Sequence, residues 1–170
     1  MKRVAADAGN LSMFDPFEVL GLERQYLLDL KVLEKHYFEA QKIAHPDRHA
    51  LAEETVRKEA LKTATAVNQA YLLLKDPLKR ATFLLQAAGV ELLQHHPQIL
   101  AQTLEWRERV EAGEDLRPEL NQLEGDLLED MKKGFQTKDF EKVRECLYGL
   151  TYVQKILQEI KGRNYASSTG

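Results

Sequence analysis

A proline between two long helical patterns limits the folds that this chain can adopt. In residues 40–49 a lysine-bearing helical pattern runs into Pro46. Proline cannot continue a helix, and it drives the preceding residue toward an extended conformation, so the first helix should end near Ala44. A second helical pattern covers about residues 52–75. The sequence therefore predicts an antiparallel helical hairpin, with the polar side chains between its arms displayed on a loop.

Apolar residues at alternating steps of three and four predict the buried face of each arm. Asp29 is a candidate N-cap for the first arm. The residues expected to line the interface are Leu30, Leu33, Tyr37, Ala40 and Ala44 in the first arm, and Val56, Ala60, Val67, Tyr71 and Leu74 in the second. Shorter helices should flank the hairpin at about residues 15–21 and 76–89, because each begins with an Asp-Pro pair that suits a helix start.

A glycine, adjacent histidines and a proline mark a domain boundary at residues 89–97. Beyond it, helical patterns at about 97–112, 118–136 and 138–161 predict a three-helix bundle. The residues expected to be buried in the last two helices are Leu120, Leu123, Leu127, Met131, Phe135, Phe140, Val143, Cys146, Leu147, Leu150, Val153, Leu157 and Ile160. The predicted ranges are a flexible N-terminus at 1–13, a first domain at 14–89, a linker at 90–97, the bundle at 98–162 and a disordered tail at 163–170.

The composition is that of a soluble globular protein, with 44% apolar and 30% charged residues. The net charge of −3 argues against general nucleic-acid binding; residues 1–89 hold 13 Lys and Arg against 12 Asp and Glu, or +1, and residues 90–170 hold 11 against 15, or −4. The single cysteine, Cys146, excludes an internal disulfide and any metal site built from several of the chain's own thiolates. The chain has no signal-peptide pattern and no apolar run of the roughly 18 residues that a membrane span needs, so we expect a cytoplasmic protein.

Two interpretations of the loop can be weighed on the residues alone. His45, Asp47 and His49 lie close together in sequence, as the ligands of a metal-dependent hydrolase can. A loop tip lacks the enclosed pocket that fixes such ligands, and no nucleophile motif accompanies the histidine, since Cys146 falls on a buried stripe. A non-enzymatic role in recognition, with no metal or cofactor, is therefore the preferred interpretation.

The order of elements around the loop resembles the J-domain of the DnaJ-like co-chaperones. In that family a lysine-bearing helix leads into a His-Pro-Asp loop and a long antiparallel helix follows, and here the loop is His45, Pro46 and Asp47. A longer motif at residues 68–81, NQAYLLLKDPLKRA, is similar to the HscB, or Hsc20, subclass. The resemblance covers about residues 14–162. It implies an all-α protein with an N-terminal J-domain, a C-terminal three-helix bundle and an L-shaped arrangement of the two.

The resemblance also implies a mechanism. Members of this subclass serve iron–sulfur cluster assembly by docking on the ATP-bound form of a DnaK-type chaperone, usually HscA, and accelerating its ATP hydrolysis. Asp47 would offer a carboxylate to a cation of the chaperone, His45 would orient the loop, and Pro46 would keep it stiff. The side chains expected to meet an acidic surface of the chaperone are Lys35, His36 and Lys42. The hydrolytic residues belong to the partner, so this chain would not be an enzyme.

A second surface is predicted on the first helix of the bundle. Its buried stripe should consist of Ile99, Thr103, Trp106 and Val110. Leu100 and Leu104 then fall on a neighbouring face, although periodicity alone also allows them to broaden the buried face. In HscB-like proteins this helix binds the cluster scaffold protein, IscU, together with an aromatic residue from the last helix. The residues that the resemblance assigns to this site are Leu100, Leu104, Glu105, Arg107, Glu108 and Tyr152, whereas Tyr148 is expected to pack inside.

The function that the sequence supports is delivery of an iron–sulfur scaffold protein to a DnaK-type chaperone. Two alternatives stay open at this point. The bundle of a J-domain protein can bind a different client, and the loop can belong to a small metal-dependent hydrolase.

Overall fold

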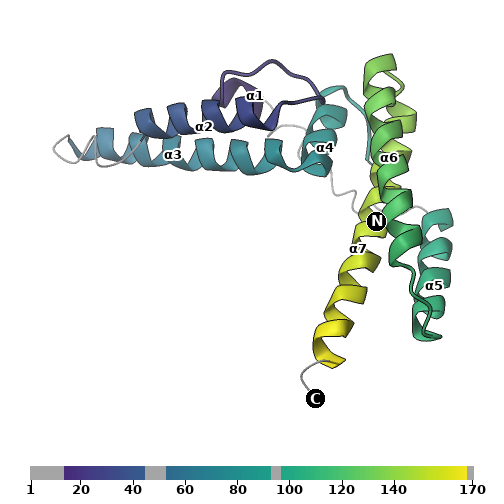
Figure 1. Ribbon diagram of the computed structural model, residues 1–170. Helices are drawn as coiled ribbons and strands as arrows, with labels where there is room; N and C mark the ends of the chain where they lie inside the picture. The colour runs from purple at the N-terminus through teal and green to yellow at the C-terminus, as the bar shows by residue number, and fades with distance from the viewer. Residues whose placement is uncertain (1–13, 45–52, 93–96, 168–170) are drawn as a thin grey trace, which may run out of the picture. The chain divides into compact units, whose positions relative to one another are not determined.

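The computed structural model describes residues 14–44, 53–92 and 97–167 (Figure 1). Every regular element in this part of the chain is an α-helix, so the all-α prediction is confirmed. The chain divides between Ala87 and Ala88 into two compact units, the N-terminal unit and the C-terminal unit, just before the predicted boundary. Among the described residues, no helix has the length and apolar character that a membrane crossing requires.

Three of the four described helices in the N-terminal unit begin at the capping residues that the sequence predicted. Its helices are α1 (Pro16–Val19), α2 (Leu30–Ala44), α3 (Glu54–Lys75) and α4 (Pro77–Ala87). The side chains of Asp15, Asp29 and Asp76 accept hydrogen bonds from the backbone amides two residues later, at 2.8, 2.8 and 2.9 Å. These bonds satisfy amides that the first turn of a helix leaves unpaired. Gly21 follows α1 with φ of +62°, a conformation that glycine adopts readily.

Helices α2 and α3 lie side by side and run in opposite directions, which confirms the predicted hairpin (Figure 1). The rings of Tyr37 and Tyr71 stack across the hairpin with their centroids 4.2 Å apart. The hydroxyl of Tyr37 donates to Asn68 Oδ1 at 3.0 Å, and the amide of Gln41 donates to the same oxygen. Aromatic stacking and polar side-chain bonds thus join the two arms beside their apolar interface.

The buried core of the N-terminal unit joins α1, both arms of the hairpin and α4. Its members are Phe17, Leu20, Leu33, Val67, Ala70, Leu74 and Phe83. Two residues of the predicted interface are not buried: Leu30 is 49% exposed and Val56 is 45% exposed. Both residues lie on the predicted stripe but in the first turn of a helix, at an end of the hairpin interface, so other side chains do not cover them fully. Tyr37, Ala40 and Tyr71 are half-buried at the edge of this core.

The C-terminal unit is the predicted three-helix bundle. It consists of α5 (Pro97–Glu111), α6 (Arg117–Thr137) and α7 (Phe140–Ser167). Helices α6 and α7 are antiparallel, and α5 lies along α7 and runs in the same direction as α7 (Figure 1). One core cluster comprises Trp106, Leu116, Leu120, Val153, Ile156, Leu157 and Ile160. Leu120 and Met131 are fully buried as predicted, whereas Leu123, Leu127, Phe135 and Phe140 are only partly buried.

The end of α7 corrects the predicted disordered tail. The sequence predicted a helix to about residue 161 and disorder over 163–170, but α7 continues to Ser167. The prediction is therefore wrong for residues 163–167, and the last three residues lie outside the described part of the chain. Gly162 follows the predicted end of the helix and lies inside α7. A single glycine costs a helix only about 1 kcal/mol relative to alanine, and no proline follows to stop it.

Candidate functional site

The predicted loop site lies outside the described residues. His45, Pro46, Asp47 and His49 fall between the end of α2 and the beginning of α3. The arm before the loop ends at Ala44, where the proline argument placed its end. Two antiparallel helices thus flank the loop, as predicted. The roles of the loop residues stay predictions.

The basic residues of α2 do not all have the environment that the sequence suggested. The side chains of Lys35 and Lys42 lie on the exposed face of the helix. His36 is half-buried instead, because its ring atom Nδ1 lies 2.8 Å from the carbonyl oxygen of Leu20 and donates to it. This bond ties α2 to the residue that ends α1, so His36 has a structural partner within the chain. The sequence held no signal for this bond, since its partner is a backbone atom 16 residues away.

An exposed phenylalanine was missed among the predicted basic residues. Phe38 is 59% exposed and lies three residues after Lys35 and four before Lys42. Residues three and four apart are neighbours on a helix surface, so the ring lies between the two lysines. Its position off the apolar stripe was the signal that could have found it. The predicted chaperone-facing surface therefore includes an exposed apolar ring beside two lysines, with Glu34 one turn before the ring.

The leucines of α5 are exposed beside a buried stripe. Thr103 and Trp106 are buried, whereas Leu100 is 41% exposed and Leu104 is 59% exposed. The alternative in which these leucines broaden the buried face is therefore wrong. A pair of exposed leucines one turn apart is an apolar surface patch of the kind that binds other proteins. Glu105 and Glu108 are exposed on the same helix, so the border of the patch is acidic.

Tyr152 lies on the flank of α7 that faces α5. This placement follows from the ion pair between Arg107 of α5 and Glu159 of α7. Leu100 and Tyr152 each precede their member of this pair by seven residues, which is close to two full turns of a helix. Helices α5 and α7 run in the same direction (Figure 1), so helical spacing from the Arg107–Glu159 pair places Leu100 and Tyr152 at one level along the same seam. Tyr152 is half-buried, as is Tyr148 one turn before it.

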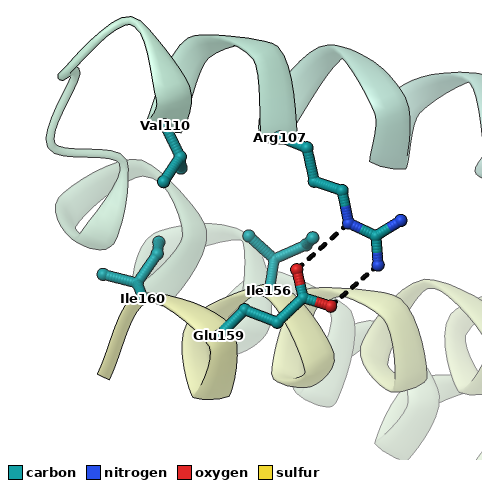
Figure 2. A pocket seen from close by; sticks show the side chains of 5 residues that line it. All are labelled: Arg107, Val110, Ile156, Glu159 and Ile160. Carbon is teal, nitrogen blue, oxygen red and sulfur yellow. Dashed lines mark hydrogen bonds and ion pairs between the residues drawn. The ribbon is translucent and has the colours of Figure 1, made fainter. Parts of the chain in front are cut away.

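Arg107, predicted to contact the client, is held by the chain itself. Its Nε and Nη2 atoms donate to the two carboxylate oxygens of Glu159, at 3.0 and 2.7 Å (Figure 2). These bonds raise the pKa of Arg107 above its ordinary value. The pair closes one side of a small pocket whose other lining residues are Val110, Ile156 and Ile160. Sequence reasoning could not have found the pair, because its members are 52 positions apart.

The second arginine of α5 is also occupied. Arg109 donates to Glu119 Oε1 and Oε2 at 3.1 and 2.8 Å, and to Glu114 at 2.9 Å. Glu105 accepts a hydrogen bond from the amide of Gln102, which carries no charge. The charge that α5 presents beside its leucines is therefore negative.

The described residues contain no group of three or more side chains that could hold a metal ion. Cys146 is buried, and burial raises the pKa of its thiol, so it stays protonated at neutral pH. A buried thiol of this kind is a packing residue and not a nucleophile. This agrees with its predicted place on the apolar stripe of α7.

Comparisons with known proteins point to one family. A family model described as the HSCB C-terminal oligomerisation domain matches residues 95–161. A co-chaperone protein HscB homolog of Aeromonas hydrophila is 32% identical over 160 residues, covering 85% of this chain and 93% of that protein. A second HscB homolog, from Burkholderia thailandensis, is 42% identical over 100 residues, covering 56% of this chain and 57% of its own length.

Solved structures have the same arrangement of helices. The chaperone HscB from Vibrio cholerae superimposes with a TM-score of 0.79 at 26% identity, covering 90% of this chain and 99% of that one. Human co-chaperone protein HscB superimposes with a TM-score of 0.81 at 24% identity, covering 89% of this chain and 83% of that one. At that identity the human protein shows the fold alone.

Proposed function

The chain belongs to the HscB family of co-chaperones, and on that basis we propose that it delivers an IscU-type iron–sulfur scaffold protein to a DnaK-type chaperone such as HscA and stimulates ATP hydrolysis there. The observation that carries the proposal is the exposed pair Leu100 and Leu104 on α5, at one seam with Tyr152. A single chain with a hairpin unit and a separate client-binding unit can connect two partners. The function requires both partners to share a compartment with this chain, for which the sequence predicts the cytoplasm.

The client surface combines an apolar centre with an acidic border. Leu100, Leu104 and Tyr152 would be covered by the scaffold protein, and Glu105 and Glu108 would remain at the edge. Both arginines of α5 are neutralised by the chain's own carboxylates, so the complementary surface of the scaffold should carry Lys or Arg. Attraction between the two charged borders would speed association, while the apolar centre would supply most of the affinity.

The hairpin unit would act on the chaperone. Asp47 and His45 would make contacts that are stronger in the hydrolysis-competent state of the chaperone than in its resting state, because only such differential contacts accelerate a reaction. Lys35 and Lys42 would steer the hairpin toward an acidic surface. His36 contributes by holding α2 against the end of α1 through its bond to Leu20, which keeps the first arm in place.

Separable defects test the proposal. His45→Gln should abolish stimulation of the chaperone's ATPase and leave scaffold binding unchanged, because the two surfaces lie in different units. Leu104→Ala with Tyr152→Ala should do the reverse. Truncating these two partly exposed side chains should cost about 2 to 3 kcal/mol of binding, or roughly 30-fold to 150-fold in affinity. Steady-state ATPase assays and calorimetric titration with apo scaffold protein measure the two effects.

Matched controls sharpen both measurements. Leu61, on α3, is as exposed as Leu104 at 59%, so Leu61→Ala should leave the scaffold affinity unchanged. His49→Gln should leave chaperone stimulation intact, whereas a hydrolase that uses His45, Asp47 and His49 would lose activity with it. Full stimulation by the His45 variant would refute the role of the loop. Stimulation by the wild-type chain with no heat on adding scaffold would show that the client is a different protein.

A further inference from the structure

Helix α5 is the most lightly anchored helix of the C-terminal unit. Among the described side chains of α5, only Thr103 and Trp106 are buried. Helices α6 and α7 pack far more extensively against each other than α5 packs against α7. A helix held by two buried side chains can rotate or open at lower cost than its neighbours. Further contacts are needed to define which face of α5 points outward.

The pair of Arg107 and Glu159 supplies such a contact. Two parallel N–H···O bonds join the guanidinium to the carboxylate, and each side chain is about a third exposed. Bidentate geometry fixes direction as well as distance, because the planar guanidinium matches the carboxylate edge to edge. The pair and the apolar side chains Val110, Ile156 and Ile160 line one small pocket between α5 and α7 (Figure 2).

The same seam carries the predicted client surface. Two turns before the pair, Leu100 of α5 and Tyr152 of α7 occupy the equivalent positions. A rotation of α5 about its axis would therefore move Leu100 and Leu104 away from Tyr152. The charged pair and the apolar patch are coupled through one rigid helix.

We propose that Arg107 and Glu159 form a clasp that sets the rotation of α5 on α7, so that Leu100, Leu104 and Tyr152 share one client-binding surface. Arg107 is then a positioning residue that does not touch the client, which differs from the contact role that the family resemblance implied. The inference rests on the proposed function for the identity of the client. The clasp itself is a property of this chain alone.

The first experiment uses the isolated protein. Arg107→Ala and Glu159→Ala should each accelerate hydrogen exchange of the α5 amides by about threefold to tenfold, the range expected for a partly exposed bidentate pair. The double variant Arg107→Glu with Glu159→Arg restores the pair with its charges exchanged, so its exchange rates should return toward wild type. Unchanged α5 exchange in both single variants would overturn the clasp, whether or not any client binds.

The second experiment measures affinity for an apo IscU-type scaffold protein by calorimetry. Both single variants should bind about twofold to fivefold more weakly, and the exchanged pair should recover most of the loss. Arg117→Ala is the matched control, because Arg117 donates to Asp115 with two bonds of 2.7 Å and belongs to α6, which begins after the end of α5. This variant should leave the affinity unchanged.

The pattern of the variants distinguishes the clasp from direct contact. If Arg107 touches the client, then Arg107→Ala weakens binding, Glu159→Ala does not, and the exchanged pair fails to recover. That result would overturn the proposal. If the wild-type chain binds no scaffold protein, the proposed client is wrong, and the hydrogen-exchange result still decides whether the clasp exists.

Discussion

Replacement of Gly134 by alanine should destabilise the C-terminal unit, because α6 and α7 approach closely at this residue. A Cβ atom there would lie 2.7 Å from Val143 Cγ2 and 3.3 Å from the carbonyl oxygen of Asp139. Val143 is fully buried and β-branched, so its methyl group cannot rotate away freely. Overpacking of this kind costs about 1 to 3 kcal/mol. Alanine returns about 1 kcal/mol through its better helix propensity, so the net loss should be at most about 2 kcal/mol.

Gly125 provides the matched control within the same helix. It is exposed, and a Cβ atom there would meet nothing within 4 Å. Gly125→Ala should therefore stabilise the unit by up to about 1 kcal/mol through propensity alone. The propensity gain is the same in the two alanine variants, so their stabilities should differ by the overpacking cost of about 1 to 3 kcal/mol.

Urea denaturation followed by the fluorescence of Trp106 measures both variants. Trp106 is the chain's single tryptophan and is buried in the core of the C-terminal unit, so its emission reports the unfolding of that unit. A Gly134→Ala variant as stable as the Gly125→Ala variant would refute the close approach of α6 and α7.

Three further predictions concern single side chains. Arg80→Met should lower the free energy of unfolding of the N-terminal unit by about 1 to 3 kcal/mol in chemical denaturation, because the buried guanidinium donates to the carbonyl of Leu74, which the variant leaves unpaired. Asp76→Ala should cost about 1 kcal/mol in the same assay, since its carboxylate caps α4. Side-chain and backbone hydrogen bonds from Arg117 lower the pKa of Asp115 from 3.8 to about 2, so an NMR titration should show its carboxyl protonating near pH 2. Arg117→Ala removes the side-chain bonds and keeps the backbone bond, so it should raise the pKa of Asp115 part of the way back to its ordinary value. Because the folded-state pKa is lowered, the stabilisation from this pair is present above pH 3.8 and is lost as the pH falls through about 2; an Asp115 titration unchanged by Arg117→Ala would contradict this.

Local signals in the sequence predicted most of the helical framework. The caps Asp15, Asp29 and Asp76 bond to amides two or three residues away, so a short stretch of sequence is enough to predict them. Helical spacing also placed Leu100 and Leu104 beside the stripe of Thr103 and Trp106, but only the structure shows that the two leucines are exposed. These features depend on neighbours one turn away.

Features that depend on distant partners were not predictable in the same way. Periodicity gives the direction of a side chain and not the depth of its burial, so Leu30 and Val56 were placed inside although both are exposed. Ile156 was left off the buried stripe of α7 because the stripe is wider than two positions per turn, and it is 1% exposed. The L-shaped arrangement of the two units and the roles of the loop residues stay predictions.

The central claim is that one chain connects a client to a chaperone, and a mixing experiment tests it most directly. His45→Gln retains the client surface, and Leu104→Ala with Tyr152→Ala retains the loop. ATP hydrolysis by the DnaK-type chaperone would be measured with and without scaffold protein, adding wild type, each variant, or both variants together. The quantity that decides is the increase in hydrolysis on adding scaffold protein, because the loop alone should already stimulate the chaperone. If delivery requires both surfaces on one molecule, this increase should be no larger for the mixture than the sum for its two variants and should remain well below that of wild type. A scaffold-dependent increase in the mixture equal to that of wild type would contradict delivery by a single chain.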